Sequence, residues 1–161
     1  LRDKNITTLR RDRLGFVFQS FNLVPTLTAR ENITLPMEIA GRKVDPQWFD
    51  EVTKRLGLTE RLNHRPAELS GGQQQRVAVA RALISRPEII FGDEPTGNLD
   101  PAISLGIMKL LDRINRAGTT VVMATHDREM VDSMRKRVIA LEAGHIVRDQ
   151  EKGGYGYYGA L

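Results

Sequence analysis

The chain has 161 residues, 40% of them hydrophobic and 27% charged, which suits a single folded domain with a core of its own. The formal net charge is +4 at pH 7. Apart from Arg10, Arg11 and Arg13 the basic residues are scattered, so we expect a solvated surface and no nucleic-acid partner. The absence of cysteine excludes disulfides and thiol chemistry. No apolar run reaches transmembrane length, so neither a membrane span nor a signal peptide is expected.

Residues 1–13 are charged and begin with neither a methionine nor a capping pattern, which indicates a fragment of a longer protein. A short apolar run of β type follows at 15–18 and delivers Gln19 to the end of a strand, where α/β proteins carry ligand-facing groups. The Gln19 amide can coordinate a metal or hold a water. For this residue alone, a loop amide that bonds the backbone is the simpler interpretation.

Residues 28–66 have helical patterns. A capping box at 28–31 starts one helix, which contains Pro36 and is expected to kink there. A second helix starts at Asp45 and stops at Gly57, and an irregular link follows it. We therefore expect a small all-helical insertion within an α/β domain.

Ser70 starts the stretch that is most informative about chemistry. The apolar residues after it fall at helical spacing, so Ser70 is predicted to cap a helix that runs to about Ser85. Gly71 and Gly72 then lie in the first turn, where backbone N–H groups can approach a ligand and the helix dipole favours an anion such as a phosphate. An ordinary serine-capped helix is the alternative for this motif alone.

Two adjacent carboxylates follow an apolar strand. Residues 88–92 predict a buried parallel strand that ends in Asp93 and Glu94. Two acids at such a strand end are costly unless a cation or water uses them. Asp93 can hold Mg²⁺ through its water shell, and Glu94 can accept a proton from an attacking water. Two acids that cap a loop are the alternative.

The remaining sequence continues the α/β pattern. Asp100 starts another helix with one apolar stripe, and Gly118 ends it. Residues 119–125 predict a second buried strand. His126 follows that strand and would share the edge of Asp93 if the two strands are parallel neighbours, so we expect it to contact a phosphate or water. A helix at 128–134 and strands at 138–141 and 146–148 come next, before a Gly/Tyr-rich tail expected to be disordered.

Five motifs in this order resemble those of the ATP-binding subunits of ABC transporters. Gln19, Leu69–Gln73, Asp93–Glu94, Asn98–Asp100 and His126 are similar to the Q-loop, the signature motif, Walker B with its catalytic glutamate, the D-loop and the switch histidine. The resemblance covers nearly the whole chain. It implies an α/β fold with a RecA-like P-loop NTPase core and an inserted helical subdomain. The core would comprise residues 1–27 and 67–152, the helical subdomain 28–66, and a flexible tail 153–161.

The resemblance also implies roles for these residues. Glu94 would be the general base, His126 would hold the γ-phosphate, and Gln19 and Asp93 would serve Mg²⁺ and water. Asp100 would lie at the dimer seam. The ATP bound to a second subunit would be clasped by the residues that start the signature helix, namely Ser70, Gly71, Gly72 and Gln73.

One element of the family pattern does not occur in this sequence. The phosphate-binding loop G-x-x-x-x-G-K-[ST] is missing, and in the family it precedes the position of Leu1. We therefore expect the N-terminal portion of the core to be absent and this fragment alone to be inactive. Catalysis by positioning and charge neutralisation needs both portions.

Within the family, residues 16–41 and 73–76 resemble the MacB and LolD group, whereas 114–149 is more similar to FtsE. The implied protein binds ATP and Mg²⁺, hydrolyses ATP, and forms a head-to-tail homodimer. It lies peripherally on the cytoplasmic face of the membrane with an integral permease or an FtsX-like partner. Its partner groove would expose Phe21, Leu23 and Val24. Two alternatives are a truncated, non-hydrolysing interaction module and a DNA-repair-type ATPase, although the long coiled coils of the latter are not indicated here.

Overall fold

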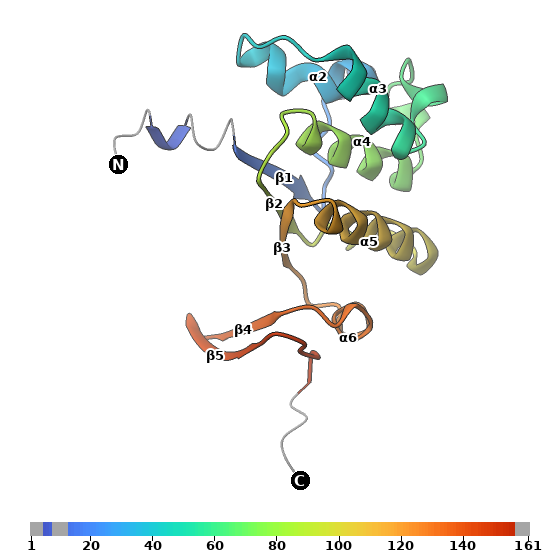
Figure 1. The fold of residues 1–161 in the computed structure, drawn as a ribbon. Coiled ribbons are helices and arrows are strands. Elements are labelled where there is room, and N and C mark those ends of the chain that lie inside the picture. The colour runs from blue at the N-terminus through green and yellow to red at the C-terminus, as the bar shows by residue number, and fades with distance from the viewer. Residues whose placement is uncertain (1–4, 8–12, 157–161) are drawn as a thin grey trace. The chain divides into compact units, whose positions relative to one another are not determined.

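A computed structural model describes residues 5–7 and 13–156. The predictions that concern Arg10, Arg11 and the tail at 157–161 lie outside the described residues. The chain divides into two compact units, the first ending at Ala124 and the second beginning at Thr125 (Figure 1). No helix among the described residues is long and apolar enough to cross a membrane.

A three-stranded parallel sheet forms the base of the first unit. It contains β1 (Leu14–Phe18), β2 (Ile89–Asp93) and β3 (Thr120–Ala124), in the order β1-β2-β3. Asp93 is in register with Phe18 on one side and with Ala124 on the other. The predicted parallel pairing is therefore confirmed, and all three strands end at one edge of the sheet.

Two helices of the first unit pack against one face of this sheet. Helix α4 (Gly71–Leu83) packs against β1, and helix α5 (Pro101–Arg116) packs against β3. On the other face Phe16 stacks on Phe91 with ring centroids 5.6 Å apart, and Val122 is 47% exposed. The prediction of a buried strand at 119–125 is right for the strand and wrong for its burial, because β3 alternates exposed and half-buried residues.

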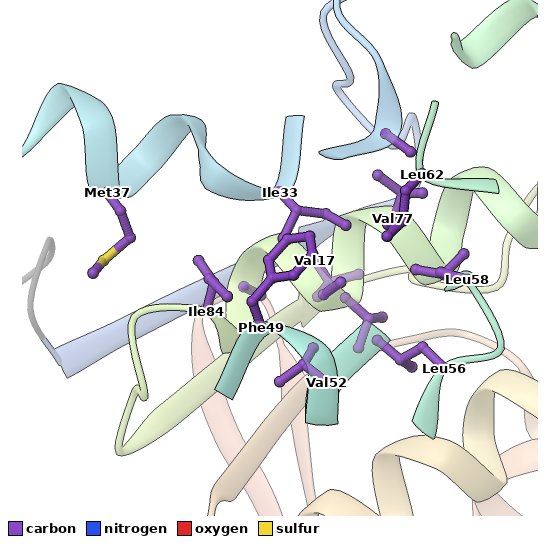
Figure 2. Close-up of a cluster of buried hydrophobic side chains, with 14 of the residues drawn as sticks. Val17, Ile33, Met37, Phe49, Val52, Leu56, Leu58, Leu62, Val77 and Ile84 are labelled. Carbon is purple, nitrogen blue, oxygen red and sulfur yellow. The ribbon is translucent and has the colours of Figure 1, made fainter. Parts of the chain in front are cut away.

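The segment between β1 and α4 is helical. It contains α2 (Ala29–Ile39), α3 (Pro46–Arg55) and two short 3₁₀ turns, η1 (Thr59–Arg61) and η2 (Pro66–Glu68). Thr28 and Glu31 form the predicted capping box, and Asp45 caps α3. The main core lies where these helices meet α4. Figure 2 shows Ile33 and Phe49 directed toward the same cluster as Val77.

The second unit contains α6 (Arg128–Met134) and an antiparallel hairpin of β4 (Val138–Glu142) and β5 (His145–Gln150). The helix and both strands were predicted from the sequence. Ala143 and Gly144 make the turn with φ of 47° and 81°, the left-handed backbone that tight hairpins require. Arg137 donates to both carboxylate oxygens of Asp149, at 2.8 and 2.7 Å, across the pair of strands.

Candidate functional site

The end of β2 presents two carboxylates in different surroundings. Asp93 is exposed at the sheet edge, whereas Glu94 is half-buried. Glu94 has a φ of 46°, and its N–H donates to the carbonyl of Ala124 at 2.9 Å. A left-handed conformation costs a non-glycine residue about 1 to 2 kcal/mol, and the hydrogen bond to the neighbouring strand helps to hold Glu94 in it.

Gln19 lies at the end of the strand next to that of Asp93, because it directly follows Phe18, which is in register with Asp93. Its side-chain Nε2 donates to Oδ1 of Asn98 at 3.2 Å, and Nδ2 of Asn98 donates back to the Gln19 carbonyl at 3.2 Å. A Cβ on Gly97 would lie 2.5 Å from the same Nε2, so a larger residue there would displace the Gln19 side chain from this position. Because the amide nitrogen is engaged, the amide oxygen is the atom available to a cation or water.

Asp93 and Gln19 therefore offer oxygen donors from adjacent strand ends. Such donors suit Mg²⁺, which takes one or two protein ligands and keeps several waters. No group of three or more His, Cys, Asp or Glu residues gathers within the part of the chain that the structure describes. The residues present thus fit a hydrated Mg²⁺ that completes its shell with water and phosphate oxygens.

The start of α4 is capped as predicted. The Ser70 Oγ accepts from the Gln73 N–H at 3.2 Å, and the Gln73 side-chain oxygen accepts from the Ser70 N–H at 2.9 Å. This capping box uses acceptor atoms of both side chains. The polar groups that the capping box does not use are all hydrogen-bond donors. They are the Ser70 hydroxyl hydrogen, the Gln73 amide hydrogens and the first N–H groups of the helix. The helix start is therefore suited to an anion.

The two glycines also serve the packing of the domain, which the sequence interpretation did not include. Gly72 is buried, and a Cβ there would lie 2.7 Å from Cγ2 of Ile103 on α5. A Cβ on Gly71 would lie 3.3 Å from Cδ2 of Leu99. The glycines thus let Leu99 and Ile103 approach the helix that starts at Ser70.

Sequence reasoning missed Gln75, which ties α4 to both loops of the site. Its buried side chain donates from Nε2 to the carbonyl of Pro95, next to Glu94, and to the carbonyl of Phe18, next to Gln19, at 3.4 Å. Gln75 shares the helical spacing of buried residues such as Val79. The predicted apolar stripe of this helix, Val77, Ala80, Leu83 and Ile84, does not include this position, so the sequence pattern gave no signal for Gln75.

Arg81, also on α4, holds the chain just after Gln19. Its guanidinium donates to the carbonyls of Asn22 at 2.7 Å and Phe21 at 2.9 Å. Phe21 and Asn22 have φ of 59° and 53°. Burial lowers the pKa of Arg81 from its usual value, and the two carbonyl acceptors offset part of that cost.

The segment after Asn22 is also fixed. The buried Asn32 side chain accepts from the Val24 N–H at 2.8 Å and donates to the Val24 carbonyl at 3.1 Å. Phe21, Leu23 and Val24 are all half-buried, so the unusual exposure expected for them is not observed. Arg81 and Asn32 explain the difference, because they hold this loop against the helices.

Asp100 and His126 are the two remaining predicted site residues. Asp100 Oδ1 accepts from the N–H groups of Ala102 and Ile103, both at 3.0 Å, and so caps α5. His126 is exposed and is the second residue of the second unit, which begins after Ala124.

A parallel sheet with oxygen ligands at its carboxyl edge, and a helix start that offers N–H and O–H groups, are the features expected of a nucleotide-binding α/β domain. Comparison with known proteins refines this class. Residues 1–97 match the sequence model of the family described as "ABC transporter". The chain belongs to the ABC transporter family and is an ATPase domain of the ABC type.

Several relatives extend over most of the chain. The cell division ATP-binding protein FtsE of Mycobacterium tuberculosis is 49% identical over 158 residues, which cover 97% of this chain and 68% of that protein. The macrolide export ATP-binding/permease protein MacB of Neisseria meningitidis serogroup B is 46% identical over 149 residues, covering 91% of this chain and 23% of MacB. These relatives do not favour the interaction-module or DNA-repair alternatives.

The fold also matches solved structures. The bacterial ABC transporter cassette MJ0796, in a dimeric structure, has a TM-score of 0.79 and 43% sequence identity, with 96% of this chain and 69% of that chain covered. A second structure of MJ0796 with the same TM-score is a dimeric post-hydrolysis state bound to ADP and Pi. The predicted α/β ABC ATPase fold is therefore confirmed.

Proposed function

We propose that this chain supplies the water-activating and signature portions of an ATPase that works as a two-subunit ATP sandwich within a membrane complex. The observation that carries the proposal is that one domain has both a surface suited to a cation and a surface suited to an anion. The strand edge at Asp93 offers oxygen donors for a cation and water. The start of α4 at Ser70 offers N–H and O–H groups for an anion.

Each proposed role follows from the chemistry of the side chain. Glu94 acts as general base toward the attacking water, and Asp93 and Gln19 hold Mg²⁺ through oxygen atoms. Mg²⁺, when bound, neutralises phosphate charge and orients the terminal phosphate. His126 holds the γ-phosphate, and Asp100 lies at the seam between subunits. The residues of the α4 start that clasp the nucleotide of the other subunit are Ser70, Gly71, Gly72 and Gln73.

The dimer and the membrane partner are proposed from the relatives. MJ0796 is dimeric, and the name of MacB joins an ATP-binding part to a permease. We assign residues 28–66 to a helical subdomain, 1–27 and 67–152 to the ATPase core, and 153–161 to a flexible tail. In this arrangement the helical subdomain transmits closure of the dimer to an integral permease or FtsX-like protein, at the cytoplasmic face of the membrane.

The test removes the proposed base without changing the size of the side chain. The phosphate-loop portion of the Mycobacterium tuberculosis FtsE relative is fused before Leu1, and phosphate release is measured for the fusion protein and its Glu94→Gln variant. Loss of general base catalysis lowers kcat about 100-fold or more, while ATP binding persists. Glu60→Gln, an exposed position in η1, serves as the control. Turnover by the Glu94→Gln protein at the parent rate would remove Glu94 from this role.

A further inference from the structure

A cavity outside the proposed nucleotide contacts is lined by cations from three helices. It has a volume of about 260 Å³ and lies where the end of α3 meets α4 and α5. Its charged lining residues are Lys54, Arg55, Arg76 and Arg113. No carboxylate is among the described residues that line it, so the lining itself supplies no counter-charge to these cations.

Arg76 lies at the centre of this arrangement. It is half-buried on α4, and two glycines leave its guanidinium uncovered. A Cβ on Gly57 would be 3.9 Å from Nη1, and a Cβ on Gly106 would be 3.8 Å from Nη2. The structure gives Arg76 no hydrogen bond or ion pair to another described residue. A half-buried guanidinium with unused donors has a strong tendency to bind an anion.

The other cations differ in how far their charge is already used. Arg55 pairs with Glu51 at 2.6 Å, and Lys54 lies in the last turn of α3, where it complements the helix dipole. Arg113 is exposed and has no ion pair within the described chain. On α5, Gly106, Leu110 and Arg113 follow helical spacing, so one face of the helix borders the cavity.

We propose that this cavity binds a small phosphate-type anion, held by Arg76 from α4 and Arg113 from α5 with Lys54 in support. Guanidinium groups bind phosphate oxygens in pairs, and cations on three helices match a tetrahedral dianion better than a single carboxylate. The volume is below the range of about 300 to 1,000 Å³ that is usual for drug-sized ligands, which favours an inorganic phosphate or a lipid headgroup over a nucleotide. The bound anion would link α3, within the helical segment, to α4 and α5.

The test uses pyrophosphate as the probe and the full chain at low ionic strength. Glycine-selective ¹⁵N labelling follows the amides of Gly57 and Gly106 at the cavity and those of Gly71 and Gly72 at the start of α4. Saturable shifts at Gly57 and Gly106 with a single dissociation constant are expected. No shift at these two glycines, or shifts only at the α4 start, would overturn the proposal. A site at α4 alone would still agree with the proposed ATPase function, so the two proposals can fail separately.

Variants separate a defined site from diffuse attraction. Arg113→Gln is expected to weaken pyrophosphate binding about tenfold, because it removes a charge-assisted hydrogen bond. Arg116→Gln, which removes the same charge from the next turn of α5 where Arg116 pairs with Asp112 at 2.9 Å, is expected to leave affinity within about twofold. Equal losses in both variants would show diffuse electrostatics and contradict a site.

A further variant fills the cavity from within. Gly106→Asp places a carboxylate near Arg76, where the added Cβ has room, and is expected to abolish pyrophosphate binding while the chain remains folded. Undiminished binding by this folded variant would overturn the assignment.

Competition then identifies the source of the phosphate group. Displacement of pyrophosphate by phosphatidylglycerol vesicles, with none by phosphatidylcholine vesicles, indicates a headgroup, and displacement by inorganic phosphate alone indicates a free anion. Both results support the site.

Discussion

Gly72 provides a direct test of how the signature helix is held against α5. In the Gly72→Ala variant, the new methyl group would lie 2.7 Å from Cγ2 and 3.4 Å from Cδ1 of Ile103. Overpacking of this kind costs about 1 to 3 kcal/mol, and the helix propensity of alanine returns less than about 1 kcal/mol in a first turn. We expect the free energy of unfolding to fall by about 1 to 2 kcal/mol, or about 3 to 6 °C in Tm for a chain of this size.

The assay is urea denaturation of four proteins that form a double-mutant cycle. Ile103→Ala removes the atoms that clash with the new methyl group, so Gly72→Ala introduced into that variant is expected to cost nothing. The coupling free energy between the two positions should be about 1 to 2 kcal/mol. A separate control is Gly106→Ala, because its Cβ would meet only the Arg76 side chain at 3.8 Å. That substitution is expected to stabilise the chain by about 0.5 to 1 kcal/mol.

The cycle can refute the packing argument. If Gly72→Ala retained full stability, or if its cost persisted in the Ile103→Ala background, the glycine would not be required for the approach of α5. Contact with a ligand would then be the remaining reason for a glycine at position 72.

Three other outcomes follow from the contacts of the site. Gln75→Leu leaves two loop carbonyls without their donor and should lower the free energy of unfolding by about 1 to 2 kcal/mol in urea denaturation; unchanged stability would mean that these bonds contribute nothing. Arg81→Met should speed amide hydrogen exchange at residues 21–24 more than elsewhere, whereas Arg81→Lys should restore protection only in part, since an ammonium lacks the guanidinium fork. The backbone hydrogen bond from Thr28 lowers the pKa of Glu31, so this contribution to stability is present above the ordinary carboxyl range and is lost as pH falls through the lowered pKa. Carboxyl ¹³C shifts would show it, and a Glu31 that titrates at its ordinary value would contradict it.

The sequence predicted those features that depend on nearby residues. Ser70 and Asp100 cap their helices as expected, because a cap is decided by a side chain and the backbone two or three residues away. The parallel neighbours around Asp93 also followed from short apolar runs separated by helical segments. Local pattern was therefore sufficient to place the helix start and the carboxylate edge.

The sequence did not predict features that depend on contacts between distant segments. The bonds from Gln75 to Phe18 and from Arg81 to Phe21 join residues more than fifty positions apart, and no periodicity reports such partners. The left-handed backbone of Glu94 is held by a hydrogen bond to the neighbouring strand. The loop at Leu23 was expected to be exposed as part of a groove for a membrane partner, whereas tertiary contacts leave it half-buried.

The central claim is that the start of α4 serves the nucleotide of the other subunit and Glu94 serves its own. The most direct measurement mixes two inactive forms of the phosphate-loop fusion protein, Gly71→Asp and Glu94→Gln. Gly71→Asp repels phosphate while its charge complements the helix dipole. A mixed dimer contains one site with an intact Glu94 and an intact partner helix, so an equal mixture should recover about a quarter of the parent ATPase rate if subunits exchange freely. Subunits that exchange but recover no activity would show that the signature helix and Glu94 act within one chain, and would contradict the claim.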